Sequence, residues 1–468
     1  MAHEVAEHGV HAELRADVSR RLLDLLGICI RASTEAPARA VGTLVARWGG
    51  TPEATAIGLP DRLPAATAAL LNGTLAHSLD FDDTHLPSVL HPSASVIPAA
   101  LATAERHNLD GSALLDAAAV GIEVVCRLGM AGYDKKLGNS VFFERGQHAT
   151  AICGAIGAAV AVGMLMRQTT EELVSSIGVA CSMGAGILEA NRTGGTVKRV
   201  HCGWAAHAGT VAAEMVNAGI TGPPTALEGR FGFFHAFIGN HFDLNELTQD
   251  LGEKWTLPDI FFKPYPCNHF THAGVDAALR LRASGLRASE VEALTLAVPT
   301  PVLRTIAEPR QDKIRPQSGY HAAFSGPYTV ASAFLGGGGL GLAHEDFTNA
   351  AAADPERLAL AEKVECVASE KCDDIFPHQF PAVLTARLRD GTTRVEEVLV
   401  NRGGPANPLS TEELRTKFSD NAEPIVGALA ANNIAHIALT MADRSTAELG
   451  TALQAALRTE QDAGERRA

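Results

Sequence analysis

The residues from Ala76 to Ser93, AHSLDFDDTHLPSVLHPS, concentrate side chains that could do chemistry. Three histidines and three aspartates stand in this short stretch of a chain that is 46% hydrophobic. Such a group could bind a metal ion, act as an acid–base site, or be an ordinary polar turn. The chain has no HExxH pair and no calcium-loop pattern, so the usual ligand spacings are missing. We therefore expect no metal and favour acid–base chemistry.

The expected local structure of this stretch is a helix end, a loop and a helix start. If the helix that begins near Pro64 continues through Phe81, then His77, Asp80 and Thr84 share one face at spacings i, i+3 and i+7. Asp82 and Asp83 fall away from that face, and we expect them to be solvated turn carboxylates.

A new helix is expected directly after His91-Pro92, with Ser93 or Ser95 as its N-cap. A helix end and a helix start joined by a loop can aim several polar side chains into one cavity. The functional candidates of this stretch are Asp80, Thr84 and His91.

His148 stands at the mouth of a long apolar stretch, 149–166. A helix N-terminus carries partial positive charge, which disfavours an imidazolium. A neutral imidazole near neutral pH can act as a base. The alternative is a histidine that only caps a buried helix.

Two further segments offer cations. Gly194-Gly195 precedes Lys198 and Arg199, and a glycine-rich loop that leads cations onto a helix start is suited to hold a carboxylate. Lys263 lies in the rigid segment FFKPYPCNHFTH. The alternatives are a solvated basic turn for the first segment and a linker lysine for the second.

Together these segments supply bases, cations and an acidic group, with no nucleophile elbow and no cofactor loop. The run GGGGLG, 336–341, matches a dinucleotide pattern only formally, because it follows a helical stretch rather than a strand. The combination favours proton transfer, without a cofactor, at a carbon beside a carboxylate.

Helical periodicity dominates the first part of the chain, and its helices are expected near 64–79, 93–106, 112–130, 149–166, 171–190 and 202–218. Short β-prone runs follow after about residue 285, and two of them flank Asp390-Gly391, a hairpin signal. Ser410 and Glu413 form a capping box that opens another helix. We predict a mainly α fold: a large helical domain from both chain ends, 1–268 and 403–468, with a smaller α+β lid domain, 269–402, inserted between them.

Composition excludes several classes of partner. The net charge of −14 repels phosphate backbones, so we expect no nucleic acid. The stretch 149–166 is too weakly hydrophobic for a membrane span and reads as a core helix. Eight cysteines without a CxxC pair, and no secretory signal, indicate a cytoplasmic protein.

The chain resembles the MmgE/PrpD family. The resemblance rests on NGTLAHSLDFDDTH…HPS, GTVKRVHCGWAAHAG, KPYPCNHFTH, SGPYTVASAF and GGPANPLSTEELRTKF, in this order, over about 72–418. It implies a homodimer that binds a di- or tricarboxylate without metal or organic cofactor. It also implies a set of site residues, of which we take His148, Lys198, Tyr328, Asp80 and His91 as catalytic groups and Thr84 and Lys263 as substrate-binding groups. Arg199, which follows Lys198, and His77, on the expected helical face of Asp80, are added as substrate-binding candidates from the residues themselves.

The family includes 2-methylcitrate dehydratases, cis-aconitate decarboxylases and iminodisuccinate epimerases. The loop from Thr84 to His91 is longer than in decarboxylase-like members, and DFDD differs from the dehydratase pattern. We therefore expect an epimerase that acts on a small dicarboxylate such as iminodisuccinate. The alternatives are a lyase of the same family and a non-catalytic carboxylate-binding protein.

Overall fold

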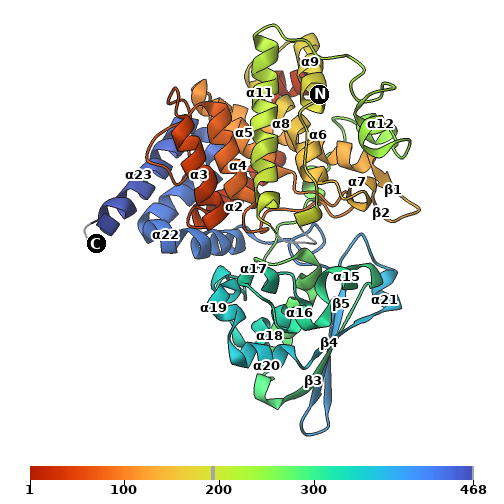
Figure 1. The fold of residues 1–468 in the computed structure, drawn as a ribbon. Coiled ribbons are helices and arrows are strands. Elements are labelled where there is room, and N and C mark those ends of the chain that lie inside the picture. The colour runs from red at the N-terminus through yellow and green to blue at the C-terminus, as the bar shows by residue number, and fades with distance from the viewer. Residues whose placement is uncertain (191–194, 466–468) are drawn as a thin grey trace. The chain divides into compact units, whose positions relative to one another are not determined.

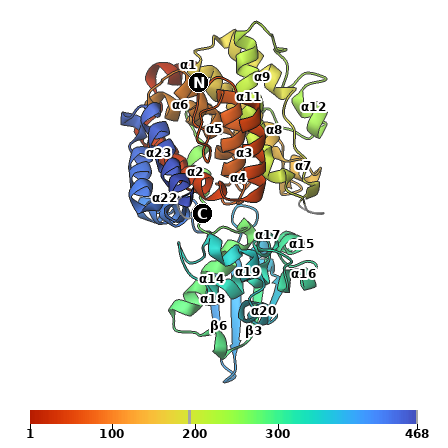
Figure 2. The same cartoon turned by 60° about the vertical axis from the view of Figure 1, so that its left-hand side comes forward.

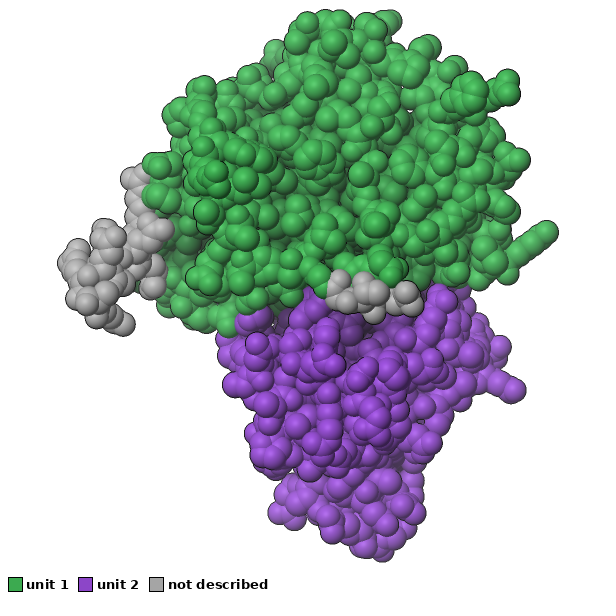
Figure 3. All heavy atoms as spheres, viewed as in Figure 1, with its two compact units in different colours: residues 1–260, 421–468 green, residues 261–420 purple. Residues whose placement is uncertain are grey.

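The computed structural model describes residues 1–190 and 195–465, with side chains up to residue 457. The chain forms two compact units (Figure 3): unit 1 comprises Met1–Ile260 and Asn421–Ala468, and unit 2 comprises Phe261–Asp420. Helices account for 58% of the residues and strands for 9%, so the expected mainly α fold is confirmed. The boundaries expected after residues 268 and 402 both fall inside unit 2.

Unit 1 is built of helices, with one minor antiparallel ladder of β1 (Tyr133–Asp134) and β2 (Asn139–Ser140). Its helices include α1 (Ala2–His8), α2 (Ala12–Ala32), α3 (Ala36–Trp48), α4 (Ala65–His77), α5 (Ser93–Arg106), α6 (Gly111–Ala131), α7 (Val141–Glu144), α8 (Ala149–Leu165), α9 (Thr170–Cys181), α11 (His201–Asn217), α12 (Phe233–Ile238), α13 (Asn245–Thr248) and α23 (Thr446–Glu465). The expected helices are present, although α9 ends well before residue 190.

Helix α8 lies at the centre of unit 1, and every one of its residues is buried. It packs against α5, α6, α9 and α11 (Figure 1). Its sequence, ATAICGAIGAAVAVGML, is almost all small and aliphatic, which allows neighbouring helices to approach it from several sides. Among the described residues, no helix combines the length and hydropathy needed to cross a membrane.

The C-terminal segment returns to unit 1. Helix α22 (Thr411–Leu439) begins in unit 2, passes into unit 1 and is interrupted at Gly427. The Ser410–Glu413 capping box at its start is present. Beyond it, Thr446 donates through Oγ1 to the carbonyl of Leu109 at 2.9 Å. Both views show α22 and α23 beside the N-terminal helices (Figures 1 and 2).

Unit 2 contains a four-stranded sheet in the order β4-β3-β5-β6. Its strands are β3 (Val291–Val298), β4 (Val364–Ala368), β5 (Ala382–Leu388) and β6 (Thr393–Val398). β3 pairs with β4 in parallel and with β5 antiparallel, and β5 and β6 form the expected hairpin around Asp390-Gly391. Helix α14 (His272–Ala283) packs on β5 and β6, and α18 (Gly326–Leu335) packs on β4 and α14.

The remaining helices of unit 2 are short. They are α15 (Leu303–Ile306), α16 (Arg310–Ile314), α17 (Gly319–Ala322), α19 (Asn349–Ala352), α20 (Pro355–Ala361) and α21 (Glu370–Asp373). With the sheet and its two longer helices they make unit 2 the expected α+β domain.

The contact between α4 and α11 brings the polar ends of both helices together. Gly73 of α4 faces Gly203 of α11 so closely that a Cβ atom on Gly73 would lie 2.9 Å from the Gly203 Cα. A Cβ on Gly203 would meet the Leu70 carbonyl oxygen and the Thr74 side chain. Because both positions lack a side chain, the C-terminus of α4 at His77 lies near the start of α11.

We predict that Gly203→Ala destabilises the protein by about 1–3 kcal/mol, because the added methyl group meets backbone that cannot move aside. Urea unfolding followed by circular dichroism measures this. Gly337→Ala is the control, since a Cβ at Gly337 would have no neighbour within 4 Å. Equal unfolding midpoints for the two variants would contradict the close α4–α11 contact.

Candidate active site

In the stretch from Ala76 to Ser93, helix α4 does not continue to Phe81 as expected. The helix ends at His77, and Ser78 donates through Oγ to the carbonyl of Thr74 at 2.6 Å. Asp80 then adopts a positive φ of 52°, which a right-handed helix does not allow. The expectation of one shared helical face was therefore wrong. The polar side chains are grouped instead by the loop between α4 and α5, residues 78–92, here named the site loop.

Asp82 and Asp83 are buried, with relative exposures of 0% and 2%, so the expectation that they are solvated was also wrong. His77 donates through Nδ1 to Asp82 Oδ2 at 2.8 Å. Asp83 Oδ2 accepts from Arg21 Nη1 at 2.8 Å and from Ser93 Oγ at 2.5 Å. Arg21 lies far along the chain from Asp83 and Ser93 follows the loop, so local spacing did not reveal the partners of Asp83.

The start of α5 is organised differently from the expected serine N-cap. Pro92 occupies the N-cap position, and neither Ser93 nor Ser95 caps the helix through its side chain. Instead Asp83 Oδ1 accepts from the backbone N–H of Ser93 at 3.3 Å. The Asp83 carboxylate thus lies at the positive end of α5, where a negative charge is stabilised.

His91 is oriented by the backbone of the same loop. Its Nδ1 donates to the carbonyl of Asp83 at 2.7 Å, with Thr84 Oγ1 at 3.3 Å from the same nitrogen. Its Nε2 lies 3.8 Å from Asp80 Oδ1. The His91 backbone N–H donates to Thr150 Oγ1, in the first turn of α8, at 3.1 Å. The loop is thereby fixed to the helix that His148 caps.

Lys198 brings a buried cation to this group. It lies in the short 3-10 helix η1 (Val197–Val200), directly before α11, and its Nζ is 3.1 Å from Asp80 Oδ1. Lys198 is 7% exposed, so the ion pair is shielded from water. Gly194 of the expected glycine-rich cradle lies outside the described residues. Arg199 pairs with Glu35 at 3.9 Å.

His148 occupies the N-cap position of α8, as its place in the sequence predicted, and it is 4% exposed. Its Nδ1 lies 3.0 Å from Nδ1 of His201, the first residue of α11. Burial, followed by the charges of His77 and Lys198, holds the pKa of His148 well below its ordinary value. The imidazole is therefore neutral near pH 7.

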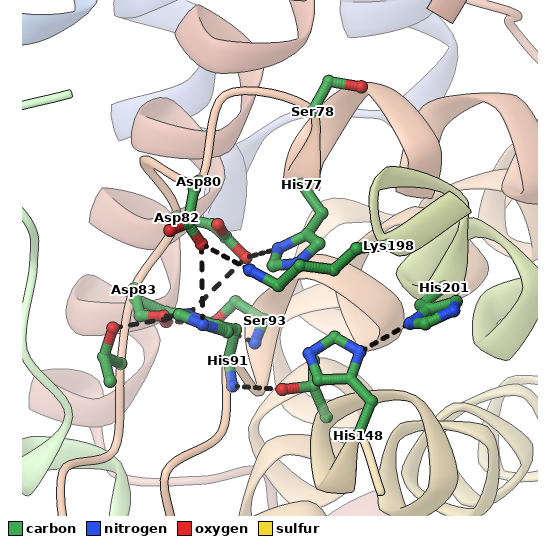
Figure 4. A network of polar contacts seen from close by, with 12 residues as sticks. His77, Ser78, Asp80, Asp82, Asp83, His91, Ser93, His148, Lys198 and His201 are labelled. Atoms are coloured by element: carbon green, nitrogen blue, oxygen red, sulfur yellow. Dashed lines mark hydrogen bonds and ion pairs between the residues drawn. The ribbon is translucent and has the colours of Figure 1, made fainter. Parts of the chain in front are cut away.

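Four imidazole rings form a continuous series through the site (Figure 4). The ring centroids of His77 and His91 are 5.1 Å apart, those of His77 and His148 are 5.5 Å apart, and those of His148 and His201 are 5.0 Å apart. Sequence reasoning gave His201 no role; its position three residues after Lys198 was the only signal.

The structure thus brings most of the sequence-predicted residues of unit 1 into one buried cluster. Its members are His77, Asp80, Thr84, His91, His148 and Lys198, and the additional members are Asp82, Asp83 and His201 (Figure 4).

Lys263 and Tyr328 belong to unit 2. Lys263 is buried, at 1% exposure. Tyr328 lies in the hydrophobic core of unit 2, where its hydroxyl donates to the carbonyl of Asp346 at 2.8 Å. Burial raises the pKa of this phenol. These surroundings suit a structural hydroxyl, and the role of Tyr328 as a proton carrier stays a prediction.

Among the residues that the structure describes, two groups of three side chains have ligand atoms within 4.8 Å of one another and could hold a metal ion: His77, Asp82 and Cys202, and His77, Asp80 and His91. In the first group, burial raises the pKa of the Cys202 thiol well above its ordinary value, so without a metal ion the thiol stays protonated. In the second group, the Lys198 ammonium already lies against Asp80. The donor chemistry favours lysine as the cation of this site.

The fold and the site define a helical scaffold that surrounds a buried neutral imidazole, a buried cation and carboxylates. The MmgE/PrpD N-terminal domain model matches residues 1–245, and the MmgE/PrpD C-terminal domain model matches residues 265–443. The chain belongs to the MmgE/PrpD family.

Curated relatives carry the names of lyases. The chain is 29% identical to the cis-aconitate decarboxylase of Homo sapiens over 87% of this chain and 83% of that protein. It is 26% identical to a cis-aconitate decarboxylase-like protein of Aspergillus oryzae over 79% of this chain and 78% of that protein. These relatives support an enzyme over a non-catalytic binding protein, and neither is named an epimerase.

We predict that Arg21→Met costs about 3–5 kcal/mol of stability, because it leaves the buried Asp83 carboxylate without its ion-pair partner. Chemical unfolding measures the loss. Arg287→Met is the control: its pair with Glu290 is exposed, so the change should cost less than about 1 kcal/mol. A loss of similar size in both variants would mean that the Arg21–Asp83 pair stabilises no more than a surface pair.

We predict that His85 makes the site loop sensitive to acid. Burial, followed by the charge of Arg21, lowers the pKa of His85 from 6.5 to about 4. Between these values the unfolded chain binds a proton that the folded chain does not, so the free energy of unfolding falls as the pH is lowered. His85→Gln should make this fall shallower.

Urea unfolding at about pH 7 and about pH 5 tests the role of His85. His8→Gln is the control, because the His8 side chain is 74% exposed and should behave as the wild type. The prediction fails if His85→Gln and wild type lose the same stability on acidification.

Proposed function

We propose that this protein is an enzyme that transfers a proton, without a metal or organic cofactor, at a carbon beside a carboxylate group of a small di- or tricarboxylate. The observation that carries the proposal is the neutral, buried His148 in one cluster with the Lys198–Asp80 ion pair. A neutral imidazole accepts a proton, and a buried ammonium both binds a carboxylate and stabilises the carbanion that forms beside it.

In this proposal the residues of unit 1 have distinct roles. His148 takes the proton, and Lys198 holds the reacting carboxylate, oriented by its contact with Asp80. His91, Thr84 and His77 supply hydrogen-bonding groups around the substrate. Arg199 is proposed to add positive charge for a second carboxylate. The substrate-binding role of Lys263, which belongs to unit 2, stays a prediction. A second copy of the chain, as a homodimer, stays part of the proposal.

Epimerisation of a small dicarboxylate such as iminodisuccinate uses both proton carriers in each turnover. The C–H bond beside the carboxylate breaks, its electron pair stays on carbon, and the proton moves to His148. Lys198 then returns a proton to the opposite face. The supporting observation is that His148 and Lys198 reach the cluster from two different elements, α8 and η1.

Decarboxylation is the second candidate, and the names of the relatives favour it. Here the bond between carbon and one carboxylate of cis-aconitate breaks, carbon dioxide leaves, and the electron pair stays on the carbon skeleton. A proton is then delivered to carbon, for which Lys198 is the candidate donor. In this reaction the essential step at the same cluster would be the delivery of a proton to carbon rather than the removal of one.

One panel of substrates in D₂O separates these reactions. Iminodisuccinate, 2-methylcitrate and cis-aconitate are each incubated with the protein, and deuterium at carbon, loss of water and release of carbon dioxide are followed by NMR. Deuterium with inversion supports the epimerase, and carbon dioxide release that far exceeds racemisation supports the decarboxylase. No exchange and no turnover with all three would overturn the proposal.

We predict that His148→Gln lowers the kcat of epimerisation by at least about 10²-fold, because it removes the base. His8→Gln should leave kcat unchanged, since His8 lies on the surface. Circular dichroism checks that the variant is folded. A folded His148→Gln variant with wild-type kcat would show that another group moves the proton.

A further inference from the structure

His201 contacts His148 in a way that the proposed function does not use. The two imidazoles meet through the same ring atom, Nδ1, at 3.0 Å. A neutral imidazole carries one proton on one of its two nitrogens. A hydrogen bond between two Nδ1 atoms therefore requires that one ring carries its proton there and that the other presents a lone pair.

Both rings are neutral near pH 7. His201 is 7% exposed, and burial followed by the charges of His77 and Lys198 lowers its pKa to about 4. The pKa of His148 is held well below its ordinary value, again by burial followed by the charges of His77 and Lys198. With two neutral rings, the shared proton has only two possible positions. If it belongs to His148, then Nε2 of His148 presents a lone pair; if it belongs to His201, then Nε2 of His148 carries a proton.

The contact is built into the backbone around the pair. The His148 backbone N–H donates to the carbonyl of Gly186 at 3.0 Å. A Cβ atom on Gly186 would lie 3.2 Å from the His148 Cβ and 3.4 Å from the His201 Nδ1. Because Gly186 has no side chain, the two imidazoles can approach to hydrogen-bonding distance.

The charges around His148 select between the two arrangements. The His148 ring lies between His201 on one side and the group of His91 and Lys198 on the other (Figure 4). A cation such as the Lys198 ammonium favours a lone pair over an N–H group on the nitrogen that faces it. His148 then keeps its proton on Nδ1 and donates it to His201.

We propose that His201 is a positioning residue that fixes His148 in the tautomer with the proton on Nδ1, so that Nε2 presents its lone pair to the substrate. This inference rests on the proposed function, in which His148 takes the proton. When the substrate C–H bond breaks, its electron pair stays on carbon and the proton binds to Nε2. The Nδ1–H bond to His201 stabilises the imidazolium that results.

The first test observes the tautomer directly and needs no turnover. The wild-type protein is prepared with ¹⁵N-labelled histidine, and the His148 signals are assigned by their absence in His148→Gln. We expect a protonated Nδ1 and an unprotonated Nε2 in His148. The opposite assignment would overturn the inference, whereas the substrate panel in D₂O tests the proposed function separately.

The second test compares two variants on the active substrate. Asn places an amide group where His201 has Nδ1, whereas Leu removes the hydrogen-bonding partner. His201→Leu should lower kcat at least about tenfold with KM changed less than about threefold, and His201→Asn should restore kcat to within about threefold of the wild type. Equal loss in both variants, or none in His201→Leu, would overturn the inference.

The two experiments separate the possible failures. An inactive wild type on all substrates counts against the proposed function, and the ¹⁵N measurement still decides the tautomer. If His201→Leu does not fold, the ¹⁵N spectrum of the wild type and the kinetics of His201→Asn decide. A kcat in His201→Asn reduced as strongly as in His148→Gln would then contradict a positioning role.

Discussion

The buried ion pair between Arg21 and Asp83 is the interaction on which the site depends. Removing two charges from water is costly, and the pair is tolerable only if the remaining hydrogen-bonding capacity of both groups is used. Arg21 also donates to Asp17 at 2.9 Å and to the carbonyls of Leu257 and Ile260 at 3.0 and 3.1 Å. The guanidinium therefore joins α2, the site loop and the chain segment at which unit 1 ends.

The second residue of the pair, Asp83, connects Arg21 to His91. The Asp83 carboxylate is held by Arg21 and Ser93, so the peptide that follows it is fixed as well. The carbonyl of that same residue accepts the Nδ1 proton of His91. The orientation of His91, and with it the side of the ring that faces Asp80, thus follows from the Arg21–Asp83 ion pair.

Local sequence patterns predicted the elements well and the contacts between them poorly. The helices, the hairpin at Asp390-Gly391 and the Ser410 capping box depend on residues within a few positions of each other, and the structure contains them. The burial of Asp82 and Asp83 depends on partners that local spacing does not reveal. One signal in the sequence was available. Arg21 lies four residues before Leu25, on a face of α2 that is otherwise apolar, and a charged residue on such a face indicates a buried partner.

The same cation that would bind the substrate also helps to keep the base neutral. The charge of Lys198 contributes to the lowered pKa of His148, after burial and the charge of His77. Under the proposed function, a substrate carboxylate placed against Lys198 partly cancels that charge at short range. The chain's net charge of −14 matters less there, because charges beyond about 10 Å are largely screened at physiological salt. In this proposal, substrate binding raises the proton affinity of His148 when a C–H proton is available, so the base is weak in the empty site and stronger in the occupied one.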